Sequence, residues 1–247
     1  MPGAAVASLA GMAVDRTNEL GLPIGADLTG WAPPRPPDAG SFTGAWTRLE
    51  RLEPRHVPDL WREFEADDEG RMWTYLPWGP FADAAAFGDA MLGATAARDL
   101  RFYAIIDRAD GAAVGLLAYL RIDPAAGSIE VGAIMLSPRV QRTRVATEAI
   151  YLLGDHVFEL GYRRFEWKCD ALNERSRRAA TRYGFTYEGT FRQATVSKHR
   201  NRDTAWFSII DGEWPRLRTA YRTWLAPENF DGDGRQRQAL SELTERA

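Results

Sequence analysis

The feature that most constrains the fold is an amphipathic helix between two strand-like segments. From Ala146 to Leu160, apolar residues recur every three or four positions, and Gly161 then ends the pattern. The apolar runs at 129–136 and 165–169 are typical of buried strands. A helix that buries one face between two such strands predicts a mixed α/β domain in which the helix packs on a sheet.

A second helix follows the later strand. Asn173 can cap this helix, which is expected at 174–183 and ends at Gly184. Asp110 and Gly111 separate two other apolar runs and predict a hairpin. The remaining expected elements are helices at 56–66, 82–97, 213–224 and 238–246, and strands at 41–52, 102–107, 113–122, 185–191 and 203–210.

Composition narrows the classes of protein. The 247 residues suit one domain with tails, and the hydrophobic fraction of 45% is enough for a core. A net charge of −3 gives no overall attraction to nucleic acid. The single cysteine, Cys169, excludes an intrachain disulfide and a cysteine-cluster metal site. With no signal sequence or membrane span, the cytoplasm is the expected location and no membrane partner is expected.

The expected domain organisation has three parts. Residues 1–40 form a proline-rich arm, which is either a disordered leader or a segment that Trp31 anchors. Residues 41–225 form the folded domain. Residues 226–247 are polar and charged, and they are expected to be a tail.

The turn before the central helix is a candidate anion site. A helix N-terminus presents unpaired main-chain N–H groups, and Arg142 and Arg144 add positive charge beside them. The alternative is an ordinary helix start with two solvated arginines, because this pattern alone is weak.

Four segments in order resemble the GNAT N-acetyltransferases, and most closely the ribosomal-protein N-terminal alanine acetyltransferases (RimJ/RimL-like). They are residues 129–138, 141–149, 170–176 and 183–185. The resemblance implies a mixed, mostly antiparallel central sheet flanked by helices, acetyl-CoA as co-substrate without a metal, and an amine acceptor. It assigns to the cofactor Met135, Leu136, Gln141, Arg142, Thr143, Arg144, Val145, Ala146, Thr147, Asn173 and Ser176.

The chain departs from the family pattern at two positions. Arg144 stands where glycine is usual, so it either keeps a helical conformation and points outward or partly blocks the site. Ala180 stands where many members carry a tyrosine acid. The resemblance to the ribosomal-protein branch implies Ser176 as the residue that returns a proton to the departing thiolate.

Glu130 is the leading candidate for the general base, because several members carry a base at a comparable place on this strand. A solvent-facing strand glutamate is the alternative. Asp170, Glu166 and Glu188 are weaker candidates for the base. A main-chain N–H near Met135 or Leu136 is expected to stabilise the oxyanion.

Other functions remain open. The chain is either an enzyme for a protein N-terminus or small amine, with a homodimer possible, or a GNAT-fold sensor or scaffold that binds acyl-CoA. An arginine-rich interaction module that uses Arg192, Arg200 and Arg202 is disfavoured by the acidic balance. Cys169 as a nucleophile lacks a histidine at motif spacing, so it is interpreted as a buried strand cysteine.

Overall fold

The computed structural model describes residues 16–67, 69–96 and 100–245. It divides into two compact units, Met1–Ala32 and Pro33–Ala247. In the first unit, residues 16–32 contain no helix or strand, only an isolated bridge between Thr17 and Pro23. Residues 1–15 of the expected arm lie outside the described residues. All the described helices and strands therefore belong to the second unit.

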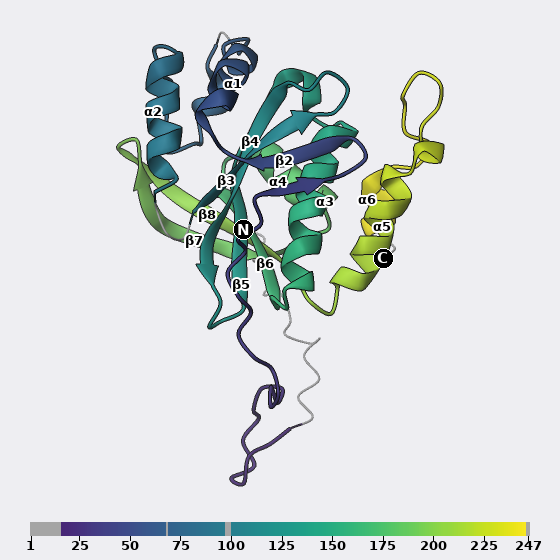
Figure 1. The fold of residues 1–247 in the computed structure, drawn as a ribbon. Helices are drawn as coiled ribbons and strands as arrows, with labels where there is room; N and C mark the ends of the chain where they lie inside the picture. Colours follow the sequence, from purple (N-terminus) through teal and green to yellow (C-terminus); the bar gives the residue numbers. More distant parts are fainter. Residues whose placement is uncertain (1–15, 68, 97–99, 246–247) are drawn as a thin grey trace, which may run out of the picture. The chain divides into compact units, whose positions relative to one another are not determined.

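The centre of the second unit is an eight-stranded sheet in the order β1-β2-β3-β4-β5-β6-β8-β7 (Figure 1). Within the described chain, β5 and β6 pair in parallel and every other neighbouring pair is antiparallel. The strands are β1 (Ser41–Thr43), β2 (Thr47–Arg51), β3 (Arg101–Asp107), β4 (Ala113–Asp123), β5 (Ser128–Leu136), β6 (Arg164–Asp170), β7 (Thr186–Ser197) and β8 (Arg200–Ile210).

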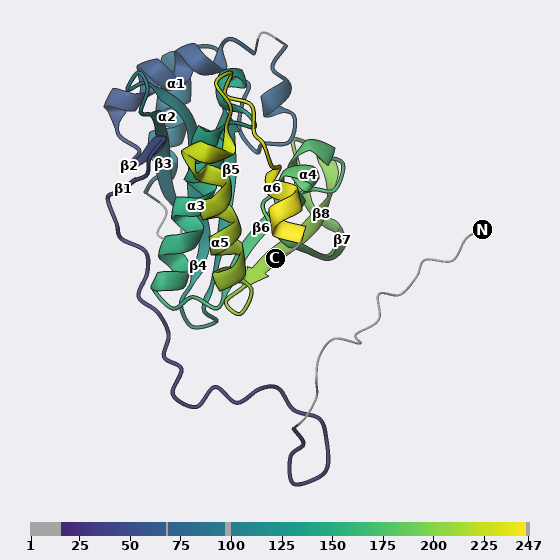
Figure 2. The ribbon, with the colours of Figure 1, turned by 90° about the vertical axis from the view of Figure 1, so that its right-hand side faces the viewer.

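Helices cover both faces of this sheet (Figures 1 and 2). The helices α1 and α2 pack over one face, and α3, α5 and α6 pack over the other. Alternating side chains of β3, β4 and β5 enter the two cores. The helices are α1 (Val57–Phe64), α2 (Ala84–Ala94), α3 (Arg144–Glu159), α4 (Glu174–Arg182), α5 (Trp214–Leu225) and α6 (Leu240–Glu245). The expected mixed α/β fold with a mostly antiparallel sheet is confirmed.

Two local predictions were wrong. The strand expected at 41–52 is a hairpin, because the chain turns at Gly44 between β1 and β2. The strands expected at 185–191 and 203–210 extend further and meet at Lys198 and His199. Both of these residues have positive φ angles, as in a two-residue hairpin turn, but neither is the glycine or asparagine that usually signals one.

The segment expected as a charged tail packs on the domain as far as Glu245. Leu240, at the start of α6, is fully buried in the core beneath α3 and α5. Asn229 is buried and ties together the loop that leads to α6. The ends of two expected helices, residues 97 and 246, lie outside the described residues.

A buried carboxylate connects α3 to the β1–β2 turn. Glu148 is 5% exposed and accepts hydrogen bonds from the main-chain N–H groups of Ala45, Trp46 and Thr47 at 2.7–2.8 Å. A side chain at Gly44 would overlap this carboxylate. Charge-assisted hydrogen bonds of this kind are among the stronger ones in proteins, so Glu148 fixes the turn relative to the first turns of α3.

Removing this carboxylate should destabilise the domain. We expect Glu148→Ala to lower the free energy of unfolding by about 2–4 kcal/mol, because three N–H donors lose their acceptor away from water. Glu148→Gln should lower the free energy of unfolding by less, since the glutamine amide keeps one acceptor oxygen. Urea denaturation measures both. Glu159→Gln is the matched control, because this glutamate of the same helix is largely exposed. Equal stability of Glu148→Ala and the control would contradict the assigned role.

Candidate active site

The strands β5 and β6 part soon after they begin to pair. Their register covers Ser128, Ile129 and Glu130 of β5, and beyond Glu130 no residue of β5 pairs with β6 in the described structure. A bulge in β5 accompanies the separation: the register with β4 shifts here, and Ala133 has a φ of 51°. The facing edges of the two strands are therefore free to bind an extended ligand.

The N-terminus of α3 lies just after this part of β5 in the chain. Thr143 occupies the N-cap position, but its hydroxyl donates to the carbonyl of Val140 at 2.7 Å and does not cap the helix. Among the described residues, no acceptor binds the main-chain N–H groups of Arg144, Val145 and Ala146. These donors and the helix dipole make the turn a positive site suited to a phosphate group.

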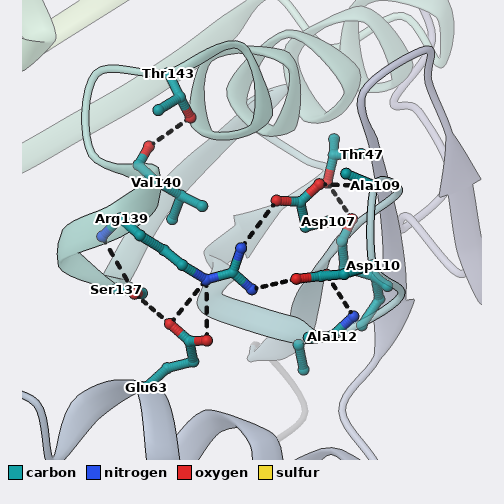
Figure 3. A network of polar contacts seen from close by, with 12 residues as sticks. Thr47, Glu63, Asp107, Ala109, Asp110, Ala112, Ser137, Arg139, Val140 and Thr143 are labelled. Atoms are coloured by element: carbon teal, nitrogen blue, oxygen red, sulfur yellow. Dashed lines mark hydrogen bonds and ion pairs between the residues drawn. The ribbon is translucent and has the colours of Figure 1, made fainter.

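Arg139 fixes the residues that lead from β5 into this turn (Figure 3). Its guanidinium contacts three carboxylates, those of Glu63 on α1, Asp107 at the end of β3 and Asp110 in the β3–β4 turn, at 3.0–3.2 Å. The hydroxyl of Ser137 also donates to Glu63, at 2.5 Å. The network joins the chain before α3 to both α1 and the sheet, so the turn has a fixed position.

Arg144 has the helical conformation that one of the two sequence interpretations requires. It is the first residue of α3, and its guanidinium lies 3.8 Å from the ring centre of Trp46 and 4.5 Å from that of Phe230. Cation–π contacts hold the side chain between these two aromatic rings. The positive φ in this turn occurs at Arg142, with a φ of 65°, so the backbone does not require a glycine at position 144.

Asn173 and Ser176 form the start of α4. The side chain of Asn173 accepts a hydrogen bond from the main-chain N–H of Ser176 at 3.1 Å, which confirms its predicted role as a helix cap. The indole N–H of Trp167 donates to the hydroxyl oxygen of Ser176 at 3.0 Å. Because the oxygen accepts this hydrogen bond, the hydroxyl of Ser176 keeps its own proton for donation to another group.

Cys169 and Ala180, which lie near Ser176 in the sequence, are both buried and have structural roles. Cys169 is buried in β6, as predicted, and burial raises the pKa of its thiol, which disfavours the thiolate that a nucleophile requires. Ala180, which replaces the family's tyrosine, is fully buried in the core. A tyrosine there would have to displace core side chains, so the fold leaves no room for one.

Glu130 lies on the sheet face opposite Trp167 and Cys169, at the point where β5 and β6 part. It is 3% exposed, and its Oε2 lies 3.2 Å from Nζ of Lys168 and 3.5 Å from Nε of Arg121. Oε2 of Glu130 is therefore ion-paired with two cations inside the structure. Burial raises the pKa of Glu130 to about 7, although Lys168 and Arg121 oppose the shift.

The weaker candidates for the base are already engaged. Glu166 accepts a hydrogen bond from Arg164 at 2.6 Å, and the same arginine binds Glu188 through two nitrogens. Asp170 accepts a hydrogen bond from the main-chain N–H of Leu172. These carboxylates support the strands and turns around Glu130, whereas Glu130 itself is buried beside two cations at the fork.

The other predicted cofactor residues lie along the same path. Met135 is buried in the core beneath α1 and α2, so its main chain alone can contact a ligand. The side-chain amide of Gln141 donates to the carbonyl of Leu136 at 3.2 Å, which ties the turn to the end of β5. The side chain of Thr147 is buried and bonds to the carbonyl of Thr143.

Sequence reasoning did not select Trp46, Lys168 or Phe230. Trp46 and Phe230 come from segments outside the recognised motifs, and no local pattern indicates that they meet at Arg144. Lys168 had one signal, because it is one of only two lysines in a chain rich in arginine. In the described part of the chain, no cluster of His, Cys, Asp and Glu could hold a metal ion, and no helix is long and apolar enough to cross a bilayer.

Known proteins match this chain in sequence and in fold. The family model for an acetyltransferase (GNAT) domain matches residues 47–186. The crystal structure of a GCN5-related N-acetyltransferase from Brucella melitensis is 45% identical, with a TM-score of 0.85, and covers 88% of this chain and 100% of its own. One described as a probable acetyltransferase of the GNAT family from Chromobacterium violaceum is 44% identical, with a TM-score of 0.73, and covers 78% and 97%.

A more distant likeness shows the fold alone. An acetyltransferase from Salmonella typhimurium that modifies the N-terminal serine of ribosomal protein L7/L12 is 21% identical, with a TM-score of 0.58, over 68% of this chain and 96% of its own. No curated protein matches the chain significantly. The family model covers more than half of the chain. The fold of the chain agrees with that of the similar structures. The chain therefore belongs to the GNAT family of N-acetyltransferases.

Proposed function

We propose that this enzyme transfers an acetyl group from acetyl-CoA directly to a primary amine, in a complex that holds both substrates. The observation that carries the proposal is the fork between β5 and β6, with a positive helix N-terminus beyond it and a buried carboxylate of raised pKa at its base. The acceptor is a small amine or a protein N-terminus, and the cytoplasm is the expected location.

The chain's own groups fit the phosphorylated and extended parts of CoA. The main-chain N–H groups of Arg144 to Ala146 and the dipole of α3 would bind the pyrophosphate. The unpaired edges of β5 and β6 would bind the pantetheine amides, and the side-chain amide of Asn173 has its nitrogen free for the same arm. Bound acetyl-CoA supplies a thioester carbonyl to the fork, where a main-chain N–H near Met135 or Leu136 would stabilise the oxyanion.

Glu130 would act as the base. The amine must lose a proton as its nitrogen forms a bond to the thioester carbon, and a carboxylate with a pKa of about 7 accepts a proton efficiently near neutral pH. We expect the proton to go to its Oε2, the oxygen that is buried beside Lys168 and Arg121. The carbon–sulfur bond then breaks, and the hydroxyl of Ser176 would give its proton to the thiolate. Ser176 would regain a proton from water, and Glu130 would release to water the proton that it took from the amine, so the overall reaction neither consumes nor produces protons.

The competing proposal is a sensor or scaffold that binds acyl-CoA without transfer. It rests on Arg144 and Ala180, the two departures from the family pattern. Because Arg144 is helical and held between aromatic rings, and a thiolate is a tolerable leaving group without a dedicated acid, neither departure requires loss of catalysis.

An acceptor screen tests the proposal. Acetyl-CoA is incubated with short peptides with free N-termini, amino acids, polyamines and aminoglycosides, and the released thiol is measured. With any accepted amine, we expect Glu130→Gln to lower kcat by about 10²–10⁴-fold, because the base is lost. Ser176→Ala should have a smaller effect on kcat. Glu159→Gln is the control and should leave kcat unchanged. Tight binding of acetyl-CoA without transfer to any of these amines would favour the sensor.

The pH at which Glu130 loses its proton depends on the neighbouring lysine. Lys168 lowers the pKa of Glu130 from the value that burial alone would give. We therefore expect Lys168→Met to raise that pKa above 7, so that the acidic limb of kcat/KM moves to higher pH. Carboxyl ¹³C NMR of glutamate-labelled protein measures the same pKa without an acceptor.

The chain's other lysine provides the matched control. Lys198 donates to the main-chain carbonyl of Trp73 and is not among the groups that shift the pKa of Glu130. Lys198→Met should leave both the NMR titration and the pH profile unchanged. An identical pH profile in Lys168→Met and the native enzyme would show that Lys168 does not tune this carboxyl.

A further inference from the structure

Two hollows lie on either side of the first residues of α3. The larger, about 460 Å³, lies toward β2 and β3, and its wall includes Trp46 and Asp107. The smaller, about 240 Å³, lies toward the segment after α5. Thr143 and Arg144 line both hollows. The side chain of Arg144, between the rings of Trp46 and Phe230, therefore separates one hollow from the other.

The outer wall of the smaller hollow is a fixed structure. It is formed by the segment between α5 and α6 (Figure 2, yellow), and Phe230 and Gln236 of this segment form a bridge. The side-chain amide of Asn229 donates to the carbonyls of Trp224 and Gln238, and its oxygen accepts from the N–H of Gln238. The indole N–H of Trp224 donates to Gln236 at 2.9 Å.

The lining of the smaller hollow is cationic and aromatic. It includes Arg142, Arg144, Trp224 and Phe230, and no carboxylate. The guanidinium of Arg142 has no ion-pair or hydrogen-bond partner among the described residues. The backbone of Arg142 adopts an uncommon left-handed conformation. The larger hollow also contains arginines, but they are engaged: Arg139 pairs with the carboxylate of Asp107, and Arg108 donates to the main-chain carbonyl of Gly44.

We propose that the smaller hollow binds the 3′-phosphorylated adenosine end of CoA, and that Arg142 and Phe230 make the enzyme selective for CoA over dephospho-CoA. This inference rests on the proposed use of acetyl-CoA. Phe230 offers an aromatic surface to the purine, and Arg142 offers a guanidinium to the 3′-phosphate. A volume of about 240 Å³ is below the usual range for a whole ligand, so it suits one end of a long substrate.

Calorimetric titration of CoA and dephospho-CoA into the full chain tests the inference. Arg142→Gly is the sharpest variant, because glycine accepts a φ of 65° and only the side chain is lost. We expect it to weaken CoA binding by about tenfold and leave dephospho-CoA binding unchanged. Phe230→Ala should weaken the binding of both by a similar factor, since it acts on the purine.

The controls are Arg192→Gly and Phe191→Ala on β7, which remove a guanidinium and an exposed ring from another surface. They should bind both ligands as the native protein does. An unchanged ratio of CoA to dephospho-CoA affinity in Arg142→Gly would overturn the inference, whether or not Phe230→Ala folds. Equal affinity of the native protein for the two ligands would overturn it as well, but would leave the proposed function intact. Failure of the native protein to bind either would overturn both.

Discussion

The parallel pairing of β5 and β6 is the constraint on which the site depends. Parallel neighbours cannot be joined by a tight turn, so the chain must cross over one face of the sheet, and α3 is that crossover. The connection begins where β5 ends, which places the unpaired N–H groups of α3 beside the edge from which β6 has separated. The unpaired strand edges and the positive N-terminus of α3 therefore both follow from the parallel pairing of β5 and β6. Glu148 and Arg139 then fix the position of that helix start.

Much of this arrangement could be predicted from the sequence, because it depends on local patterns. The periodicity of α3, the cap at Asn173 and the terminating glycines each act over a few residues, and they appear in the structure close to where they were expected. The position of the turn at Lys198 and His199 was harder to predict, because the pairing of β7 with β8 determines it and neither residue is the glycine or asparagine typical of such turns.

The chemistry of the candidate site was harder to predict, since it depends on long-range contacts. Nothing around Glu130 in the sequence indicates that burial raises its pKa or that Lys168 and Arg121 oppose the shift. The contact of Arg144 with Trp46 and Phe230 joins three distant parts of the chain. The segment after α5 was expected to be a tail because it is polar, yet one of its polar side chains, Asn229, holds it in place by bonding main-chain groups of Trp224 and Gln238.

That last segment has a consequence for comparisons within the family. The match to the family model ends at residue 186, whereas Trp224, Phe230 and Gln236 come afterwards. The strands and helices that define membership in the family thus supply one side of the smaller hollow, and sequence outside the family definition supplies the other. Two members that are alike across the shared domain can differ completely in this wall. Their C-terminal segments must be compared directly before any preference for a nucleotide is transferred from one to the other.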